Sequence, residues 1–501
     1  EIDPGLRSLV PRDHPTVQNM ELAEDLFSGS EIVVIAIETD SLLSERTLTK
    51  FSALQDSLEA MDLISRTASI YSQKHIVPDD GGFGIEPLFD DIPSDSAGRA
   101  LLLQTLHESG VIGNLVSEDL KLMCFIAQVD ASLDFDEIEF REELFRIIEE
   151  FEGPERIHLA SPVISSAESI NNVKRDLRTF TPIALGLMIF LLLLSFRSWA
   201  GIFLPLFVVA FSILWTFGLM AWLDLSVPII GGLIPIMLIA IANNYGIHII
   251  SHYFEYTVMD QELTRAAILR RTMSKLGMPI FLAGTTTIVS FMSLMSHELS
   301  KVREIGLLVS FGIGVAFLLS LFLIPSILIL VPRPTYLSKR KSMLLVNEFL
   351  VSWGRFFTKY RVPFLVILFT VMVLFSLGIR DITIDTVPDH FFPKNSKIRI
   401  ANQVISRAFG GSTQLNILIE GDIYDPIVLS HIDKLTDHIK QQNETVTSTY
   451  SITDIIKKMH FAFNNGNYDS LKIPEDRELI TQYMFLYSLT GDDDDFNLIL
   501  D

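Results

Sequence analysis

Five polar side chains stand inside one long apolar stretch, Gly231–Tyr253, and their types and spacing could support chemistry. In chain order they are Asn243, Asn244, Tyr245, His248 and His252. Inside hydrocarbon such a group costs free energy unless a neighbouring helix or a water-filled cavity receives it. Asn244 and His248 are four residues apart, so they share one face of a helix. We predict that this face carries the function.

The chemistry open to these side chains is hydrogen bonding or proton transfer. In one interpretation they form interhelical hydrogen bonds, each worth about 0.6–2 kcal/mol. In another, His248 relays protons, because imidazole titrates near neutral pH. His252 lies nearer the end of the stretch and is assigned to the membrane surface. No acid accompanies the two histidines in the spacing of a zinc motif, so we expect neither a metal nor a cofactor.

A second group of candidates lies in a neighbouring apolar run, directly after Gly284. Thr285, Thr286 and Thr287 could turn their hydroxyls toward the Gly231–Tyr253 stretch. Small residues also let helices approach closely, and packing is the interpretation that we favour for them.

Six apolar runs predict a polytopic α-helical membrane protein. Of the 501 residues 49% are hydrophobic, and each run is near the ~20 residues that a helix needs to cross a bilayer. Five predicted helices fall within residues 177–331 and a sixth within 362–380. The runs are Phe180–Phe196, Ile202–Leu223, Ile229–Tyr253, Pro279–Met295, Ile305–Leu330 and Val362–Ile379.

The flanking regions, residues 1–176 and 381–501, have the composition of soluble α/β domains. In the first, short β-branched runs alternate with helical patterns, which favours βαβ-type units. Residues 1–170 hold 34 Asp and Glu against 11 Lys and Arg, and an acidic surface argues against nucleic-acid binding. Predicted strands are Glu31–Glu38 and Lys121–Val129; predicted helices are Leu48–Leu63, Ala100–Leu106 and Phe135–Phe151.

Basic residues predict the orientation of the chain in the membrane. The linker 332–361 holds seven Lys and Arg, including Lys339-Arg340-Lys341, and Phe254–Gly277 holds four more. These segments are predicted to be cytoplasmic, which puts the acidic domains outside. Lys301 and Arg303 lie on the opposite side and are a minor exception to this pattern.

The chain repeats its own beginning. A constant offset over about a hundred residues indicates a duplication with a period far too long for a solenoid. By this comparison we expect the 501 residues to be an incomplete piece of a longer chain. At an offset of 382 or 381, the matched pairs include Ile35-Ala36-Ile37-Glu38 with Ile417-Leu418-Ile419-Glu420, Asp40 with Asp422, and Pro93 with Pro474.

This plan resembles the resistance-nodulation-division (RND) permease superfamily, and within it the MMPL and hopanoid-exporter-like branch, whose membrane core is similar to a sterol-sensing domain. The likeness rests on Ser195–Leu206, Ala240–Tyr253 and Arg303–Leu328. It implies ferredoxin-like, porter-type domains outside a bacterial inner membrane, on the periplasmic side. It also implies proton-driven export of a hydrophobic or lipid-like substrate.

The resemblance raises a question at Asn244. Family members often carry a proton-binding acid in a pattern like G-x-x-x-D-Y, and the matching positions are Ala240 and Asn244-Tyr245. An amide does not titrate. This half could therefore be the inert partner of an acidic site in a second half, which adds a third interpretation of the polar face.

Other functions remain open beside export. The chain could be a sterol-sensing-like receptor or regulator, or an accessory to protein or lipoprotein traffic similar to the SecD/SecF pair. We expect no enzyme, because the sequence shows no nucleophile elbow, phosphate loop or CxxC pair. The expected partners are membrane lipids, the substrate, a periplasmic or outer-membrane protein and a second copy of the chain.

Overall fold

The structure is a computed structural model of the chain and is mainly helical. It describes residues 2–3, 10–11, 13–26, 30–79, 82–130, 135–196, 198–260, 262–332, 344–383, 388–410, 417–442, 446, 449, 451–464 and 466–490. Lys339-Arg340-Lys341 of the basic linker lie outside these residues. The chain divides into two units, residues 1–12 with 169–386 and residues 13–168 with 387–501.

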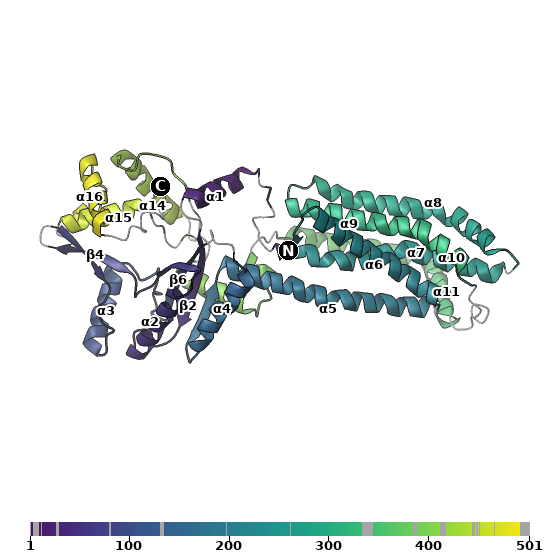
Figure 1. Ribbon diagram of the computed structural model, residues 1–501, viewed down its shortest axis with the longest axis horizontal. Helices are drawn as coiled ribbons and strands as arrows, with labels where there is room; N and C mark the ends of the chain where they lie inside the picture. The colour runs from purple at the N-terminus through teal and green to yellow at the C-terminus, as the bar shows by residue number, and fades with distance from the viewer. Residues whose placement is uncertain are drawn as a thin grey trace. The chain divides into compact units, whose positions relative to one another are not determined.

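The first unit contains the long apolar helices, several of which run side by side in Figure 1. Two short strands, β1 (Ile2–Asp3) and β8 (Val227–Pro228), pair in parallel beside them. The helices are α5 (Pro162–Phe196), α6 (Trp199–Trp222), η2 (Ile229–Gly232), α7 (Leu233–Met259), α8 (Arg265–Met292), η3 (Ser293–Ser296), α9 (Ser300–Leu318), the π-helical η4 (Leu319–Leu323), α10 (Ile324–Leu330), α11 (Leu344–Lys359), α12 (Arg361–Leu377) and η6 (Gly378–Asp381).

The six predicted crossings are confirmed as helices, with different bounds. Among the described residues six helices are long and apolar enough to cross a membrane. The run predicted from Phe180 belongs to α5, which begins at Pro162, and the run predicted from Pro279 belongs to α8, which begins at Arg265. Both helices extend into polar sequence, and α8 continues through Pro279. Hydropathy marks only the apolar part of a helix, and proline is tolerated inside membrane helices.

Two helices form the centre of the membrane bundle. They are α7 and α9: 50% and 44% of their apolar windows are buried, whereas the share is 11% for α8 and zero for α12. At Gly312 of α9 the helices approach too closely for a side chain, because a Cβ there would lie 2.5 Å from Thr216 Oγ1 and 2.7 Å from Leu238. The Ser212 hydroxyl of α6 donates a hydrogen bond to the Gly312 carbonyl at 2.7 Å. The small residue thus lets α9 approach α6 and α7 closely.

The second unit is built on a four-stranded sheet with strand order β3-β6-β2-β7, in which all neighbours are antiparallel. The predicted βαβ units are present, but each has another strand between its two parallel strands. Strands β2 and β3 run parallel with β6 between them, and strands β6 and β7 run parallel with β2 between them. The helix predicted over Leu48–Leu63 ends earlier, at Glu59. The elements are α1 (Pro15–Leu26), β2 (Ser30–Glu38), α2 (Glu45–Glu59), β3 (Ile64–Ala68), β4 (Lys74–Asp79), β5 (Gly82–Pro87), α3 (Ser96–Glu108), β6 (Leu122–Asp130), α4 (Glu137–Glu150) and β7 (Arg156–Ala160).

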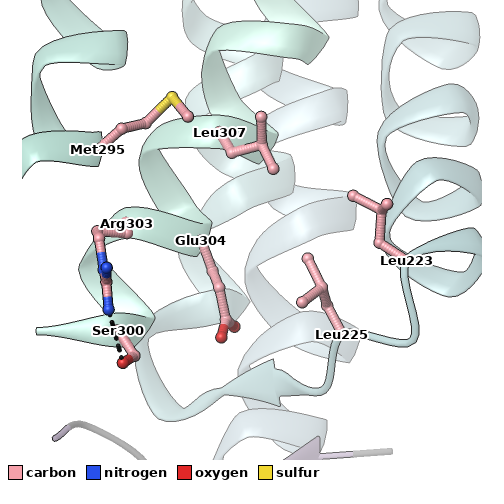
Figure 2. A pocket seen from close by; sticks show the side chains of 7 residues that line it. All are labelled: Leu223, Leu225, Met295, Ser300, Arg303, Glu304 and Leu307. Atoms are coloured by element: carbon pink, nitrogen blue, oxygen red, sulfur yellow. Dashed lines mark hydrogen bonds between the residues drawn. The ribbon is translucent and has the colours of Figure 1, made fainter. Parts of the chain in front are cut away.

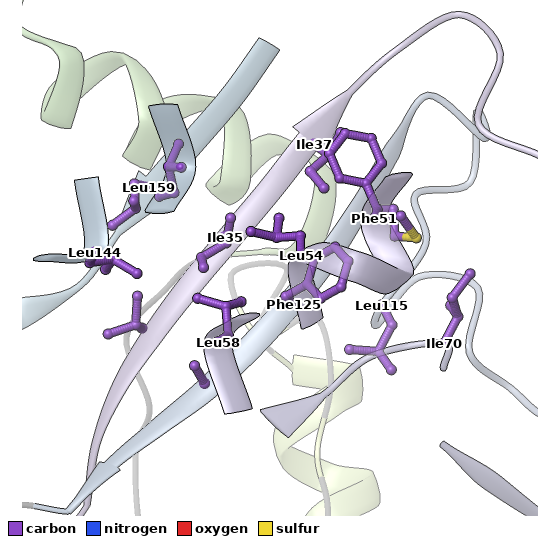
Figure 3. Packing of buried hydrophobic residues seen from close by; sticks show 14 of the residues in the cluster. Ile35, Ile37, Phe51, Leu54, Leu58, Ile70, Leu115, Phe125, Leu144 and Leu159 are labelled. Atoms are coloured by element: carbon purple, nitrogen blue, oxygen red, sulfur yellow. The ribbon is translucent and has the colours of Figure 1, made fainter. Parts of the chain in front are cut away.

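Helices α2 and α4 cover one face of this sheet. Alternate residues of β2, such as Ile35 and Ile37, meet Phe51 of α2 and Leu144 of α4 in the main hydrophobic core (Figure 3). The other face carries Cys124, and burial raises the pKa of its thiol to about 12. That thiol stays protonated at neutral pH, so it is a packing group and not a nucleophile.

The C-terminal part of the second unit is helical in the described residues. Helix α13 packs across the second face of the sheet, where Ile405 meets Val34, Ala36 and Ala160. Residues 417–420, which match the β2 segment Ile35–Glu38 in sequence, form no strand, and Ile417 is half exposed. The elements are η7 (Pro388–Phe391), α13 (Lys397–Phe409), α14 (Pro426–Gln442), α15 (Ile452–Phe463), η8 (Tyr468–Ser470) and α16 (Arg477–Thr490).

The contact at Gly312 yields a stability prediction. We expect Gly312→Ala to lower the free energy of unfolding of the purified protein by about 1–3 kcal/mol, because the new methyl overpacks the junction of α6, α7 and α9. Gly314 is the matched control on the same helix, since a Cβ there meets only Ile288 at 3.9 Å. Gly314→Ala should be neutral or stabilising by up to about 1 kcal/mol. Equal thermal unfolding temperatures for the two variants in detergent would contradict this account.

Candidate functional site

The central part of α7 is flanked by an irregularity in the neighbouring helix. The backbone between α9 and α10 widens into the π-helical turn η4, and this turn brings Ser320 and Ile324 against Gly246 of α7. A Cβ on Gly246 would lie 2.6 Å from Ile324 and 3.8 Å from Ser320 Oγ. A π-helical turn inside an α-helix is frequently found at a functional site.

The structure separates the four predicted residues onto different faces of α7. Asn244 and His248 share one face as predicted, and both side chains are exposed. Tyr245 is buried and points elsewhere, while Asn243 is half-buried. None of the four side chains makes a hydrogen bond to another described residue. The site is therefore one exposed polar pair and a separate polar region inside the bundle.

Tyr245 belongs to an aromatic cluster between α7, α8 and α9. Its ring packs edge-on against Phe317, with centroids 5.8 Å apart, and Phe317 also contacts Phe281 at 6.0 Å. Gly284 lies directly beneath the Phe317 ring, because any Cβ there would overlap that ring. This cluster is apolar and well packed, so it positions α7 against α8 and α9.

Asn243 and Ser320 are two of the residues in the bundle whose buried polar atoms have no hydrogen-bond partner in the described part of the chain; Thr181 Oγ1 and His252 Nδ1 are others. Asn243 lies three residues before Gly246 and so shares the face that meets η4. The Oδ1 atom of Asn243 and the Oγ atom of Ser320 are both buried without a hydrogen-bond partner among the described residues. Such a group costs about 1–3 kcal/mol when left unsatisfied. A buried polar group of this kind is suited to bind a water molecule.

The secondary candidates are the three threonines and His252; Thr286, Thr287 and His252 make contacts within their own helices. The hydroxyls of Thr286 and Thr287 donate to the carbonyl of Ala283 in their own helix, at 3.0 and 2.8 Å, and Thr285 is exposed. Nδ1 of His252 lies 3.1 Å from Oε2 of Glu255, one turn further along α7, at an ion-pair distance without hydrogen-bond geometry. The structure thus gathers neither group around Asn244.

No carboxylate of α7 is near the expected proton site. The acid nearest to Asn244 along the helix is Glu255, eleven residues away, which corresponds to about 16 Å of helix. No group of three or more His, Cys, Asp or Glu that could hold a metal occurs in the part of the chain that the structure describes. Within α7, His248 is the titratable side chain on the exposed polar face.

Sequence reasoning missed Ser320 and Gly246. Ser320 looks like an ordinary small residue in an apolar run, and the sequence gives no sign of the π-helical turn that buries it. A glycine flanked by polar residues at positions 243–248 was the available signal, because glycine in a membrane helix often marks a close approach of another helix.

Comparison with known proteins shows two likenesses. The family model described as "MMPL family" matches residues 8–364. A protein of Methanocaldococcus jannaschii, named only as a membrane protein, is 22% identical over 347 residues, which are 66% of this chain and 84% of that protein.

The unpartnered Ser320 hydroxyl can be tested against a partnered one. Ser212 and Ser320 are both fully buried in the bundle, but only Ser212 donates a hydrogen bond between helices. We expect Ser212→Ala to lower the free energy of unfolding by about 1 kcal/mol and Ser320→Ala to leave it unchanged or raise it. Thermal unfolding in detergent measures both. A loss for Ser320→Ala as large as that for Ser212→Ala would show that the Ser320 hydroxyl has a partner.

Proposed function

The chain belongs to the MMPL family of membrane proteins, and on that premise we propose that it is a secondary transporter that exports a hydrophobic or lipid-like substrate. In this proposal the export is driven by protons. The membrane is the cytoplasmic membrane of the cell, and the acidic domains lie outside it.

The observation that carries the proposal is the exposed polar pair on α7. Asn244 and His248 are exposed although α7 is the most buried of the candidate membrane spans. Polar groups within a membrane face protein or a water-filled cavity, because contact with hydrocarbon is costly. We therefore infer that a second helix bundle, from another part of the protein or from another copy, covers this face. A carboxylate of that bundle would take the proton that Asn244 cannot.

The helix positions support the proposed duplication. Helix α13 begins at Lys397, 382 residues after α1 begins at Pro15. Helices α14 and α16 each begin 381 residues after α2 and α3. Helix ends are defined only to within one or two residues, so these offsets agree with those of the sequence matches. Two such copies related by an axis along the membrane normal are a known transporter plan.

The sheet of the second unit supports a porter-type domain. The strands of the sheet and the helices on its face follow in the order β2-α2-β3-β6-α4-β7, with β4, β5 and α3 inserted between β3 and β6, and the strands lie in the order β3-β6-β2-β7. This is the β-α-β-β-α-β arrangement of ferredoxin-like folds. Domains of this kind outside the membrane are what the RND resemblance implies for the route of an exported substrate.

One of the two side chains that oppose the proposed orientation, Lys301, has a structural role. Lys301 is buried, with Nζ 2.9 Å from Ser226 Oγ and 3.3 Å from Glu304 Oε2. A buried, paired ammonium is a structural group and does not weigh against the positive-inside rule.

A receptor or regulator is the second candidate function. Asn244 favours it, since an amide at the family's proton-binding position cannot drive transport by itself. The two functions differ in whether any substrate moves.

Proton coupling can be measured with the purified protein in liposomes. We expect a fluorescent phosphatidylglycerol to move faster between leaflets when a proton gradient is imposed, and a protonophore to abolish that increase. Movement that ignores the gradient would remove the coupling from the proposal. Complete absence of movement for this and other lipid probes would favour the receptor.

A substitution separates the roles of the two histidines of α7. If His248 relays protons, His248→Ala should reduce gradient-driven movement to the level of protein-free liposomes without changing expression or thermal stability. His252→Ala is the matched control one turn away, beside Glu255, and should retain activity. Full activity of His248→Ala would show that His248 does not relay protons, and the proton site would then lie in the covering bundle alone.

A further inference from the structure

An open pocket of about 600 Å³ lies at one end of the membrane bundle. In Figure 2, Leu223 and Leu225 form one side of it, while Met295, Ser300 and Arg303 face them from the other. The walls come from the C-terminal end of α6 and the loop after it, from η3, and from the first two turns of α9. The lining residues are Leu223, Leu225, Met295, Ser300, Arg303, Glu304 and Leu307. This volume is within the range of small-molecule sites, about 300–1,000 Å³.

The residues around the pocket are typical of the level where a membrane meets water. Trp222, the last residue of α6, is 83% exposed, and tryptophan is enriched at that level. The chain then turns sharply at Asp224, which adopts a left-handed conformation with φ of 54°. On α9 the charged residues are in the first turns and Leu307 is deeper along the helix. An occupant would therefore meet charge at one end and leucine at the other.

Of the two charged residues that line the pocket, Glu304 has a partner of opposite charge and Arg303 has none among the described residues. Glu304 Oε2 is 3.3 Å from Lys301 Nζ, so that carboxylate has a buried cation as its partner. Arg303 is exposed, and the hydrogen bond that its guanidinium makes among the described residues is to Ser300 Oγ, at 3.2 Å. A guanidinium has five N–H donors in a planar fork that fits phosphate or carboxylate. Arg303 thus offers a free positive charge beside an apolar surface.

We propose that this pocket binds an anionic amphiphile, with Arg303 holding its phosphate or carboxylate headgroup and Leu223, Leu225, Met295 and Leu307 lining its hydrocarbon chain. That this amphiphile belongs to the substrate class of the protein rests on the proposed export function. The binding itself needs no transport. The amphiphile is a membrane lipid that occupies the pocket permanently or the exported substrate that visits it; the two share this chemistry.

Photolabelling in nanodiscs tests the binding. Photoreactive phosphatidylglycerol should label the peptides that contain residues 223–225 and 295–307, and photoreactive phosphatidylcholine, which has no net charge, should label them far less. We expect Arg303→Gln to reduce the phosphatidylglycerol label by about tenfold, as the loss of a charge-assisted contact predicts, and Arg303→Lys to retain most of it.

The matched control is Arg270, an exposed arginine near the opposite end of α8. Arg270→Gln should label like the unaltered protein. Equal labelling by the two lipids, or an undiminished label in Arg303→Gln, would overturn the proposal. Thermal unfolding of each variant shows whether the bundle is intact, and recovery of the label by Arg303→Lys excludes a merely structural role for the side chain.

Competition separates the two sources of the ligand. Dodecyl phosphate added from solution should displace the label if the pocket exchanges its occupant as a substrate site does. A label that resists displacement identifies a resident lipid. Labelling without any gradient-driven lipid movement in liposomes would support the proposed binding pocket and contradict the export function. Lipid movement without labelling would support the export function and contradict the binding pocket.

Discussion

The close approach of α9 to α6 and α7 at Gly312 is the contact on which the membrane unit depends. It leaves no room for a side chain, and the Ser212 hydroxyl closes it with a hydrogen bond to the Gly312 carbonyl. With α9 held there, the π-helical turn that follows places Ser320 and Ile324 against Gly246. These contacts decide which face of α7 is buried. The exposure of Asn244 and His248 is a consequence of that packing.

The ends of the bundle are stabilised by a different kind of contact. At one end Arg265 donates from Nη1 to the carbonyls of Ile329 and Leu330, at 3.3 and 3.4 Å, where α10 leaves its last backbone acceptors unpaired. At the other end Lys301 is buried between Ser226 and Glu304. Long basic side chains thus satisfy polar groups at both ends of the bundle, whereas Arg303 is exposed beside the pocket.

The second unit shows how distant parts of the chain complete one fold. The strands of residues 30–160 form the sheet, yet its second face is covered by α13, more than two hundred residues later. The segment 417–420 matches β2 in sequence but does not form a strand in this structure. A strand in the middle of a sheet requires neighbours on both sides, so the same sequence takes its conformation from the strands available to it.

The amino-acid sequence by itself determined the class of the protein, six long apolar helices beside an acidic α/β region, and it predicted a repeat with an offset of 382 or 381. Hydrophobic runs and alternating patterns are local properties, and Ser30–Glu38 and Leu122–Asp130 are strands almost where they were expected. The sequence also placed Asn244 and His248 on one helical face, because helical spacing is fixed by geometry. Only the tertiary structure decided that this face is exposed, that Tyr245 packs on Phe317, and that Ser320 is buried without a hydrogen-bond partner among the described residues. Those facts depend on how neighbouring helices approach α7, and no spacing within α7 contains that information.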